Sequence, residues 1–190
     1  YYSGMGPGML SGTYRPEDIR FATRHVVEKT GGRFIRDKAV GIDPDQKVVM
    51  TAGSEPIPYD VLSCNAGSHV PRPDIDGDVA DMFTVKPIER LIEAKGRLVD
   101  HFGRHATNVV IVGGGPSASE VAGNVWQLAA ETGGQLPRIT VCAGSRFMSR
   151  FPQSVRRRIV STLSRRGIDI REGVYVRSVS ADTVTLDSGK

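Results

Sequence analysis

Residues 109–118 read VVIVGGGPSA, and this segment predicts the architecture of its part of the chain. The apolar run at residues 108–112 predicts a buried β-strand, which the three glycines interrupt. A helix is predicted from the glycines to about residue 131, and a second strand at residues 138–142. Strand, glycine-rich turn, helix and strand together predict a βαβ unit of the α/β class.

The glycines fit the G-x-G-x-x-A pattern of a loop that binds the diphosphate of a dinucleotide. Gly113 permits a tight turn, Gly115 lets the backbone approach a pyrophosphate, and the small Ala118 allows the helix to lie against the strand. Free amides at the helix N-terminus then face the phosphate charge. A glycine-rich turn that binds nothing is the alternative, and the flanking strand and helix argue against it. The candidate phosphate-binding residues are Gly113, Gly114, Gly115, Pro116, Ser117 and Ala118.

Three further residues bear on which dinucleotide binds. Glu120 is expected one turn inside the helix, where it either contacts the nicotinamide end or complements the helix dipole. An NAD site usually has an acid at the end of the second strand, and no acid stands there. Ser145 and Arg146 follow that strand instead and could receive the 2′-phosphate of NADP, although an ordinary polar loop is equally consistent with them.

The rest of the chain alternates between helix-like and strand-like patterns. Residues 1–14 have the glycine-rich composition of a loop. A helix is expected from residue 16 to the glycines at 31–32, with Ile19, Ala22 and Val26 on one face. A second helix is expected at residues 87–102, and residues 103–107 look like a boundary. The expected strands are residues 33–42, 47–51, 59–65 and 168–171, with a hairpin formed by 174–180 and 183–186.

Composition excludes several classes of protein. With 190 residues and 39% hydrophobic content, the chain can bury one good core or two small ones. No apolar run approaches the roughly 20 residues that cross a bilayer.

The net charge of +4 comes largely from arginines near residues 156–166. Val155, Ile159 and Leu163 mark an amphipathic helix there, which places the arginines on its outer face, so no nucleic-acid binding is expected. Cys64 and Cys142 lie in apolar runs and are expected to be buried thiols.

Three segments resemble one known family, the FAD-dependent pyridine nucleotide oxidoreductases. GGGPSASEVAG at residues 113–123 is similar to the family's second dinucleotide loop. YSGMGPG at residues 2–8 resembles a loop of one NADH dehydrogenase-like subgroup. YDVLSCNAGS at residues 59–68 is similar to a strand that returns close to FAD, with departures in its middle. The resemblance covers essentially the whole chain and is greatest to the type II NADH dehydrogenase-like branch, which includes sulfide:quinone reductase relatives.

This resemblance implies a flavoprotein fold with two dinucleotide-binding domains. Residues 1–104 would be a partial FAD-binding domain, and residues 105–190 a Rossmann-like NAD(P)-binding domain truncated at its C-terminus. The family's first FAD loop is absent, and residues 187–190 look like a hairpin turn that has been cut, so we expect a piece of a protein about twice as long. The resemblance places these residues beside FAD: Tyr2, Ser3, Gly4, Pro7, Lys38, Ala39, Val40, Ala66, Gly67 and Ser68.

The resemblance also implies an activity for the longer protein. NAD(P)H would pass a hydride to FAD, and electrons would continue to a quinone, another small molecule or a protein partner. No catalytic side chain or metal ligand is assigned, because the two cofactors carry this chemistry. The absence of a CxxxxC pair argues against a disulfide reductase. The alternative is a non-catalytic module that responds to NAD(P)H and FAD by changing its protein partners.

Three further expectations concern behaviour and assembly. The fragment alone should be inactive, hold no FAD stably, and bind NAD(P)H weakly. The chain is expected in the cytoplasm, with attachment to a membrane only through segments outside it. A homodimer is left open.

Overall fold

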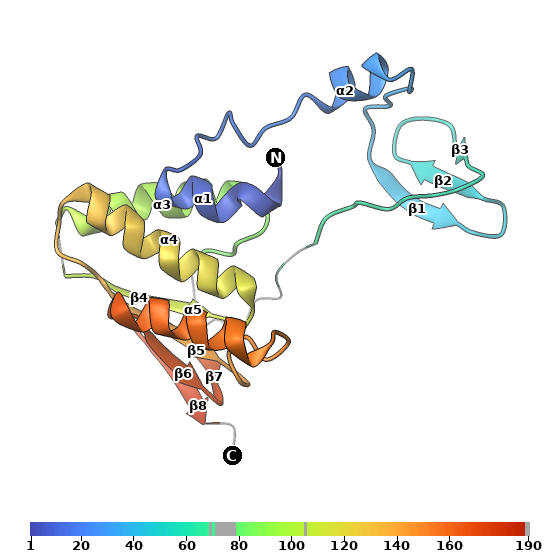
Figure 1. Ribbon diagram of the computed structural model, residues 1–190. Helices are drawn as coiled ribbons and strands as arrows, with labels where there is room; N and C mark the ends of the chain where they lie inside the picture. Colours follow the sequence, from blue (N-terminus) through green and yellow to red (C-terminus); the bar gives the residue numbers. More distant parts are fainter. Residues whose placement is uncertain (69, 71–78, 105, 189–190) are drawn as a thin grey trace. The chain divides into compact units, whose positions relative to one another are not determined.

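A computed structural model describes residues 1–68, 70, 79–104 and 106–188 (Figure 1). The chain divides into a first unit, residues 1–20 and 68–190, and a second unit, residues 21–67. These boundaries differ from the expected functional division between residues 104 and 105, because the start of the chain packs with the βαβ part. The functional division therefore stays a prediction.

The first unit is built on a parallel sheet in the order β4-β5-β6. β4 is Asn108–Val112, β5 is Arg138–Ala143 and β6 is Asp169–Glu172. The connections are α4, Pro116–Thr132, and α5, Gln153–Arg165. Because parallel neighbours are joined by right-handed crossovers, both helices belong on one face of the sheet, and α4 and α5 are in contact (Figure 1). The predicted βαβ unit is confirmed.

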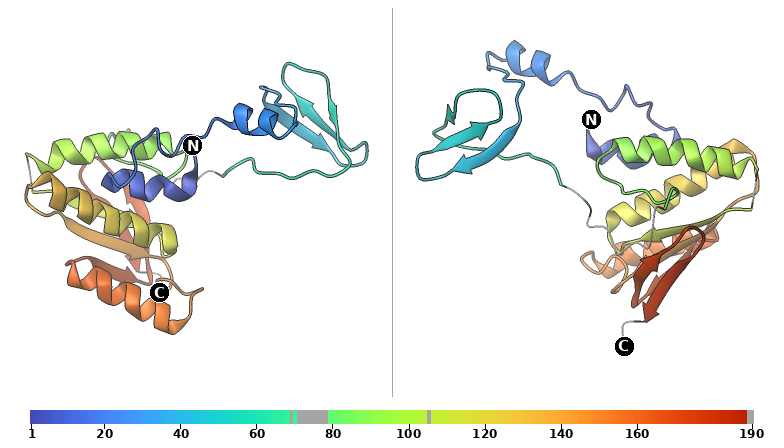
Figure 2. Two further views of the ribbon diagram at one scale, coloured as in Figure 1. Left: turned by 45° about the horizontal axis from the view of Figure 1, so that its top comes forward. Right: turned by 180° about the vertical axis from the view of Figure 1, so that it is seen from behind.

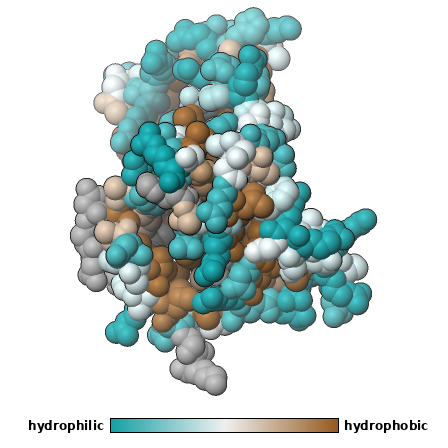
Figure 3. Space-filling view, turned by 90° about the vertical axis from the view of Figure 1, so that its left-hand side faces the viewer, coloured by the Kyte–Doolittle hydropathy of each residue, from teal (hydrophilic) through white to brown (hydrophobic). Residues whose placement is uncertain are grey.

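The core of this unit lies between α4 and the sheet. Ile139 and Val141 of β5 are almost fully buried and meet the small and branched side chains of α4, such as Ala122 and Val125. Burying one large aliphatic side chain contributes about 1.5–3 kcal/mol. β4 is less buried than expected, because it lies at the edge of the described sheet: Ile111 is buried, but Val112 is 60% exposed. Figure 3 shows apolar residues, in brown, among polar ones on the face in view.

Two helices outside the βαβ unit, α1 and α3, cover α4, and the short η1 contacts α1. η1 is Ser3–Met5, α1 is Gly6–Ser11 and α3 is Glu89–Phe102. The expected loop at residues 1–14 is therefore wrong. Met9 and Leu10 place α1 in the core, and a Cβ at Gly6 would collide with Ile88, so glycine here permits close packing as well as flexibility. The expected helix at residues 87–102 is confirmed.

The helix expected from residue 16 begins later than its pattern suggests. α2 is Thr23–Lys29 and lies in the second unit. The Asp18 carboxylate accepts hydrogen bonds from the backbone and the guanidinium of Arg15, which close a local turn before the helix. Ile19 is buried in the first unit, whereas Val26 is 56% exposed, so the expected common face does not exist.

The second unit contains a small antiparallel sheet. β1 is Ala39–Asp43, β2 is Val48–Thr51 and β3 is Ile57–Pro58, in that order. The strand expected at residues 59–65 is wrong, because β3 ends at Pro58 and, among the described residues, only the Tyr59 N–H continues the pairing, by donating to the Lys47 carbonyl at 2.9 Å. Cys64 is exposed for the same reason, contrary to expectation. None of residues 21–67 is buried, so backbone pairing holds this unit more than a core does.

The first unit ends in an antiparallel hairpin, as predicted. β7 is Val174–Val179 and β8 is Val184–Ser188 (Figure 2, right). Asp187 and Ser188 belong to β8 rather than to a turn, and residues 189–190 lie outside the described part of the chain. On α5, Leu163 is buried but Val155 is 39% exposed, so the expected apolar stripe is covered at one end only.

A prediction about packing follows from Gly134, the second residue after α4. A Cβ there would collide with the carbonyl oxygen of Phe102 at the end of α3. Gly134→Ala should lower the free energy of unfolding by about 1–3 kcal/mol, the usual cost of overpacking, in urea denaturation followed by circular dichroism. As the control, Gly96→Ala in the exposed interior of α3 should raise it by about 0.5–1 kcal/mol, because no atom crowds the new methyl group. Equal stability of the two variants would contradict the close packing.

Candidate dinucleotide-binding site

The glycine turn leaves β4 at the edge of the sheet where all three parallel strands end. Gly113 has φ +143, a backbone conformation that favours glycine. Its N–H donates to the carbonyl of Cys142 at 2.9 Å and extends the β4–β5 pairing by one residue. A Cβ at Gly113 would lie 3.6 Å from that of Ala118, so the turn packs against the first turn of α4. The geometry thus has the tight turn and the close packing expected at Gly113 and Ala118, and their part in binding stays a prediction.

Two backbone donors at the start of α4 are free. Gly115 is the N-cap residue and Pro116 begins the helix. Across the described part of the chain, no acceptor takes the N–H of Gly115 or of Ser117, and both residues are exposed. A Cβ at Gly115 would meet no atom within 4 Å. Open space and two free amides at a helix N-terminus fit a bound diphosphate.

Gly114 has a different task from its neighbours. A Cβ there would lie 3.1 Å from the Cβ of Ala143, so the glycine lets the turn pass close to the end of β5. Its carbonyl accepts a hydrogen bond of 2.6 Å from the N–H of Met148. The phosphate turn is thereby attached to the loop that follows β5.

That loop, residues 144–152, presents the predicted 2′-phosphate residues. Ser145 and Arg146 are both exposed, and the described structure gives neither a hydrogen-bond partner. The neighbouring Phe147 is fully buried and anchors the loop. Parallel strands that end together bring this loop beside the phosphate turn, at the edge where dinucleotides bind in such sheets.

Sequence reasoning missed Glu172, the last residue of β6. Its Oε1 accepts hydrogen bonds from the Phe147 N–H at 2.8 Å and from Arg156 Nη2 at 2.6 Å. Burial raises the pKa of this carboxyl, but the hydrogen bonds and the charges of Arg156 and Arg146 outweigh burial and leave the pKa below its ordinary value. A carboxylate at the end of the third strand was the available sequence signal, since the expected strand ended one residue early.

Glu120 is exposed on α4, just beyond the first turn of the helix. It lines a groove of about 780 Å³ between α4 and α5 that touches the phosphate turn only at Pro116. Helix-dipole effects fall off within the first turn, so the interpretation that Glu120 complements the helix dipole is the weaker of the two. The contact with nicotinamide stays a prediction.

The predicted FAD residues are divided between the two units. Tyr2, Ser3, Gly4, Pro7 and Ser68 belong to the first unit, with the first three in or beside η1 and Pro7 in α1. Lys38, Ala39, Val40, Ala66 and Gly67 belong to the second unit, and all five are exposed. Each unit is defined by itself, so the FAD assignments stay predictions.

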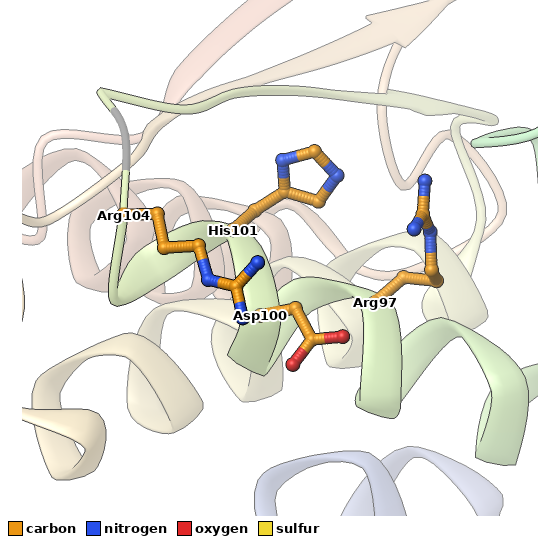
Figure 4. A pocket seen from close by; sticks show the side chains of 4 residues that line it. All are labelled: Arg97, Asp100, His101 and Arg104. Carbon is orange, nitrogen blue, oxygen red and sulfur yellow. The ribbon is translucent and has the colours of Figure 1, made fainter.

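A small cavity of about 100 Å³ lies on α3, and two of the side chains that line it bind the segment before the helix. Arg97, Asp100, His101 and Arg104 line it (Figure 4). Arg97 forms an ion pair with Asp81 at 2.8 Å, and His101 lies 3.4 Å from the same carboxylate. These contacts attach the segment before α3 to the helix.

Two kinds of feature are absent from the described residues. No group of three or more His, Cys, Asp or Glu side chains is arranged to hold a metal ion there. None of the helices in that part of the chain combines the length and apolar character that crossing a membrane requires.

Comparison with known families identifies the class of this protein. Residues 6–190 match the family described as pyridine nucleotide-disulphide oxidoreductase. The match spans nearly the whole chain, so the chain belongs to this family. The family expected from the sequence is confirmed, together with its α/β dinucleotide-binding fold.

Solved structures give the same fold. NDH2 from Plasmodium falciparum in complex with NADH matches with a TM-score of 0.77 and 16% identity, over 99% of this chain and 44% of that one. The sulfide:quinone oxidoreductase of Aquifex aeolicus has a TM-score of 0.77 and 20% identity, over 98% and 45%. The ferredoxin reductase of the CYP199A2 system from Rhodopseudomonas palustris has a TM-score of 0.76 and 19% identity, over 100% and 46%.

The chain thus spans less than half the length of each of these three structures. At these identities, the likeness to them concerns the fold alone. A search of curated proteins gave no match.

A pH-dependent prediction follows from Glu172. Its folded-state pKa is lowered, so its contribution to stability is present above the ordinary value of 4.5 and is lost as pH falls through the folded-state pKa. Glu172→Gln should therefore lower the melting temperature at pH 7 and lose less stability than the wild type between pH 5 and 3, both measured by calorimetry. The same difference between variant and wild type at pH 7 and at pH 3 would contradict the assigned ion pair.

Proposed function

We propose that the turn at Gly113–Gly115 and the start of α4 bind the diphosphate of NADH or NADPH. The observation that carries the proposal is the pair of free, exposed amides of Gly115 and Ser117 facing open space at the carboxyl edge of a parallel sheet. This is where dinucleotides bind in folds of this kind, and the helix dipole favours the phosphate charge. Family membership supports the same assignment.

In the longer protein, we propose a flavin-dependent NAD(P)H oxidoreductase. The bound cofactors would supply the redox chemistry, in which nicotinamide gives a hydride to FAD. The residues of this chain bind and orient: the amides of Gly115 and Ser117 hold the diphosphate, and the loop after β5 holds the adenosine end. Such a site needs position more than a catalytic side chain.

The electron acceptor is proposed by class only. We favour a quinone or another small molecule, as the resemblance to NADH dehydrogenases implies. The sulfide:quinone oxidoreductase fold neighbour supports the first choice. The ferredoxin reductase neighbour supports a protein carrier as the alternative.

For the nicotinamide cofactor, we propose that NADPH is accepted through Ser145 and Arg146. Both side chains are exposed on the loop beside the phosphate turn. The last residue of β5 is Ala143, so no acid from this strand competes for the ribose 2′ position. A hydroxyl and a guanidinium both donate hydrogen bonds. They therefore suit the 2′-phosphate of NADPH, which accepts them, better than the ribose 2′-hydroxyl of NADH, to which an NAD site usually offers an acid.

Gly115→Ala tests the diphosphate site. The added methyl group contacts no protein atom, and the backbone at φ −98 accepts alanine, so the melting temperature should fall only by the small cost of alanine at an N-cap. The methyl group should nevertheless weaken NADH and NADPH binding alike by about 1–3 kcal/mol, because it fills the space of the pyrophosphate. Isothermal titration calorimetry on the 190-residue chain measures both affinities, with Gly96→Ala as the control that leaves them unchanged. Undiminished binding to Gly115→Ala would refute the assignment.

Arg146→Ala tests the choice between the cofactors. Loss of a charge-assisted contact should weaken NADPH by about 1–3 kcal/mol and leave NADH unchanged. Parallel titrations with the two cofactors give the comparison, and Arg150→Ala, an exposed arginine further along the same loop, is the matched control. Equal losses for NADH and NADPH would show that Arg146 does not recognise the 2′-phosphate.

A further inference from the structure

The acid missing from the end of β5 has a counterpart on the next strand. In the parallel register, Glu172 of β6 stands opposite Ala143 of β5. Its carboxylate is therefore placed beside the loop that carries Ser145 and Arg146. A free carboxylate here would repel the 2′-phosphate of NADPH and could accept a hydrogen bond from the 2′-hydroxyl of NADH.

Arg156 of α5 keeps this carboxylate from being free. Its Nη2 lies 2.6 Å from Glu172 Oε1, and its Nε donates to the carbonyl of Phe147 at 2.9 Å. The side chain of Arg156 is 19% exposed and that of Glu172 is 37% exposed, so the pair is shielded from solvent on the arginine side only. Both side chains thus bind the backbone of Phe147: Glu172 accepts a hydrogen bond from its N–H, and Arg156 donates one to its carbonyl.

The arrangement has an electrostatic consequence for the neighbouring site. The charge of Arg146 also reaches Glu172, since it helps to lower the pKa of that carboxyl. If Glu172 were uncompensated, it would attract Arg146 and compete with a bound phosphate for it. With Arg156 in place, one positive charge offsets the carboxylate and Arg146 remains available.

We propose that Arg156 and Glu172 are a specificity-determining positioning pair: Arg156 neutralises Glu172 and fixes the Phe147 backbone, so that the loop after β5 accepts the 2′-phosphate of NADPH. The proposal rests on the proposed dinucleotide site and adds residues that do not touch the cofactor themselves. Release of Glu172 from Arg156 shifts the preference toward NADH.

The experiment measures NADPH and NADH affinities of the 190-residue chain and four variants by calorimetric titration. Arg156→Met should weaken NADPH about tenfold while NADH changes by less than about twofold, since an uncompensated acid repels the extra phosphate. Glu172→Gln keeps an oxygen for the Phe147 N–H and removes the charge, so its NADPH-to-NADH affinity ratio should equal or exceed that of the wild type. The double variant should regain the wild-type ratio. Arg157→Met removes the same charge from an exposed position on α5 and should change nothing.

The outcomes separate this inference from the proposed function. Wild-type binding of either cofactor, lost in Gly115→Ala, supports the site whatever the Arg156 variants do. Equal weakening of NADH and NADPH in Arg156→Met would reduce the pair to a structural contact and overturn the inference. So would a double variant that keeps the ratio of Arg156→Met, because the charge of Glu172 would then have no part in the effect. Should Arg156→Met fail to fold, a ratio below wild type in Glu172→Gln would overturn it as well.

Discussion

The structure of the first unit depends on the parallel pairing of β4 with β5. The last bond of this pairing, from the Gly113 N–H to the Cys142 carbonyl, fixes where β4 stops and the turn begins. Because both strands run in the same direction, the loops after them emerge at one edge of the sheet. The hydrogen bond between Met148 and Gly114 then joins these loops. A surface with free amides and a neighbouring polar loop is the direct result.

Helix packing gives this edge its rigidity. α4 lies on the sheet through fully buried residues such as Ala122 and Ala129, and α1 and α3 cover it from outside. Close-packed helices cannot shift without opening cavities, so the N-terminus of α4 stays aimed along the strand ends. The second unit is different, since none of residues 21–67 is buried. The site assigned with the most physical support accordingly lies in the unit with a core.

The arginine-rich part of the chain shows how neighbouring charges acquire separate tasks. Arg156 is held by Glu172 and Phe147, and Arg166 lies over the ring of Trp126 between α4 and α5. Arg146 remains exposed on the loop after β5. Net charge alone suggests an undifferentiated basic surface. Contacts separate arginines that stabilise the fold from one available to a ligand.

Local sequence patterns were enough to predict the βαβ unit, its glycine turn, α3 and the final hairpin, because hydrophobic periodicity and glycine chemistry are local properties. These patterns could not predict that residues 6–11 form a buried helix, because glycine-rich composition is typical of a loop. Here glycine is required instead by the close approach of α1 to Ile88. The same limit applied to residues 59–65, whose backbone pairing among the described residues stops after the Tyr59 N–H, and to Glu172. Only the tertiary structure brought Glu172, Arg156 and Phe147 together, because strand register and helix packing are long-range constraints that no short pattern encodes.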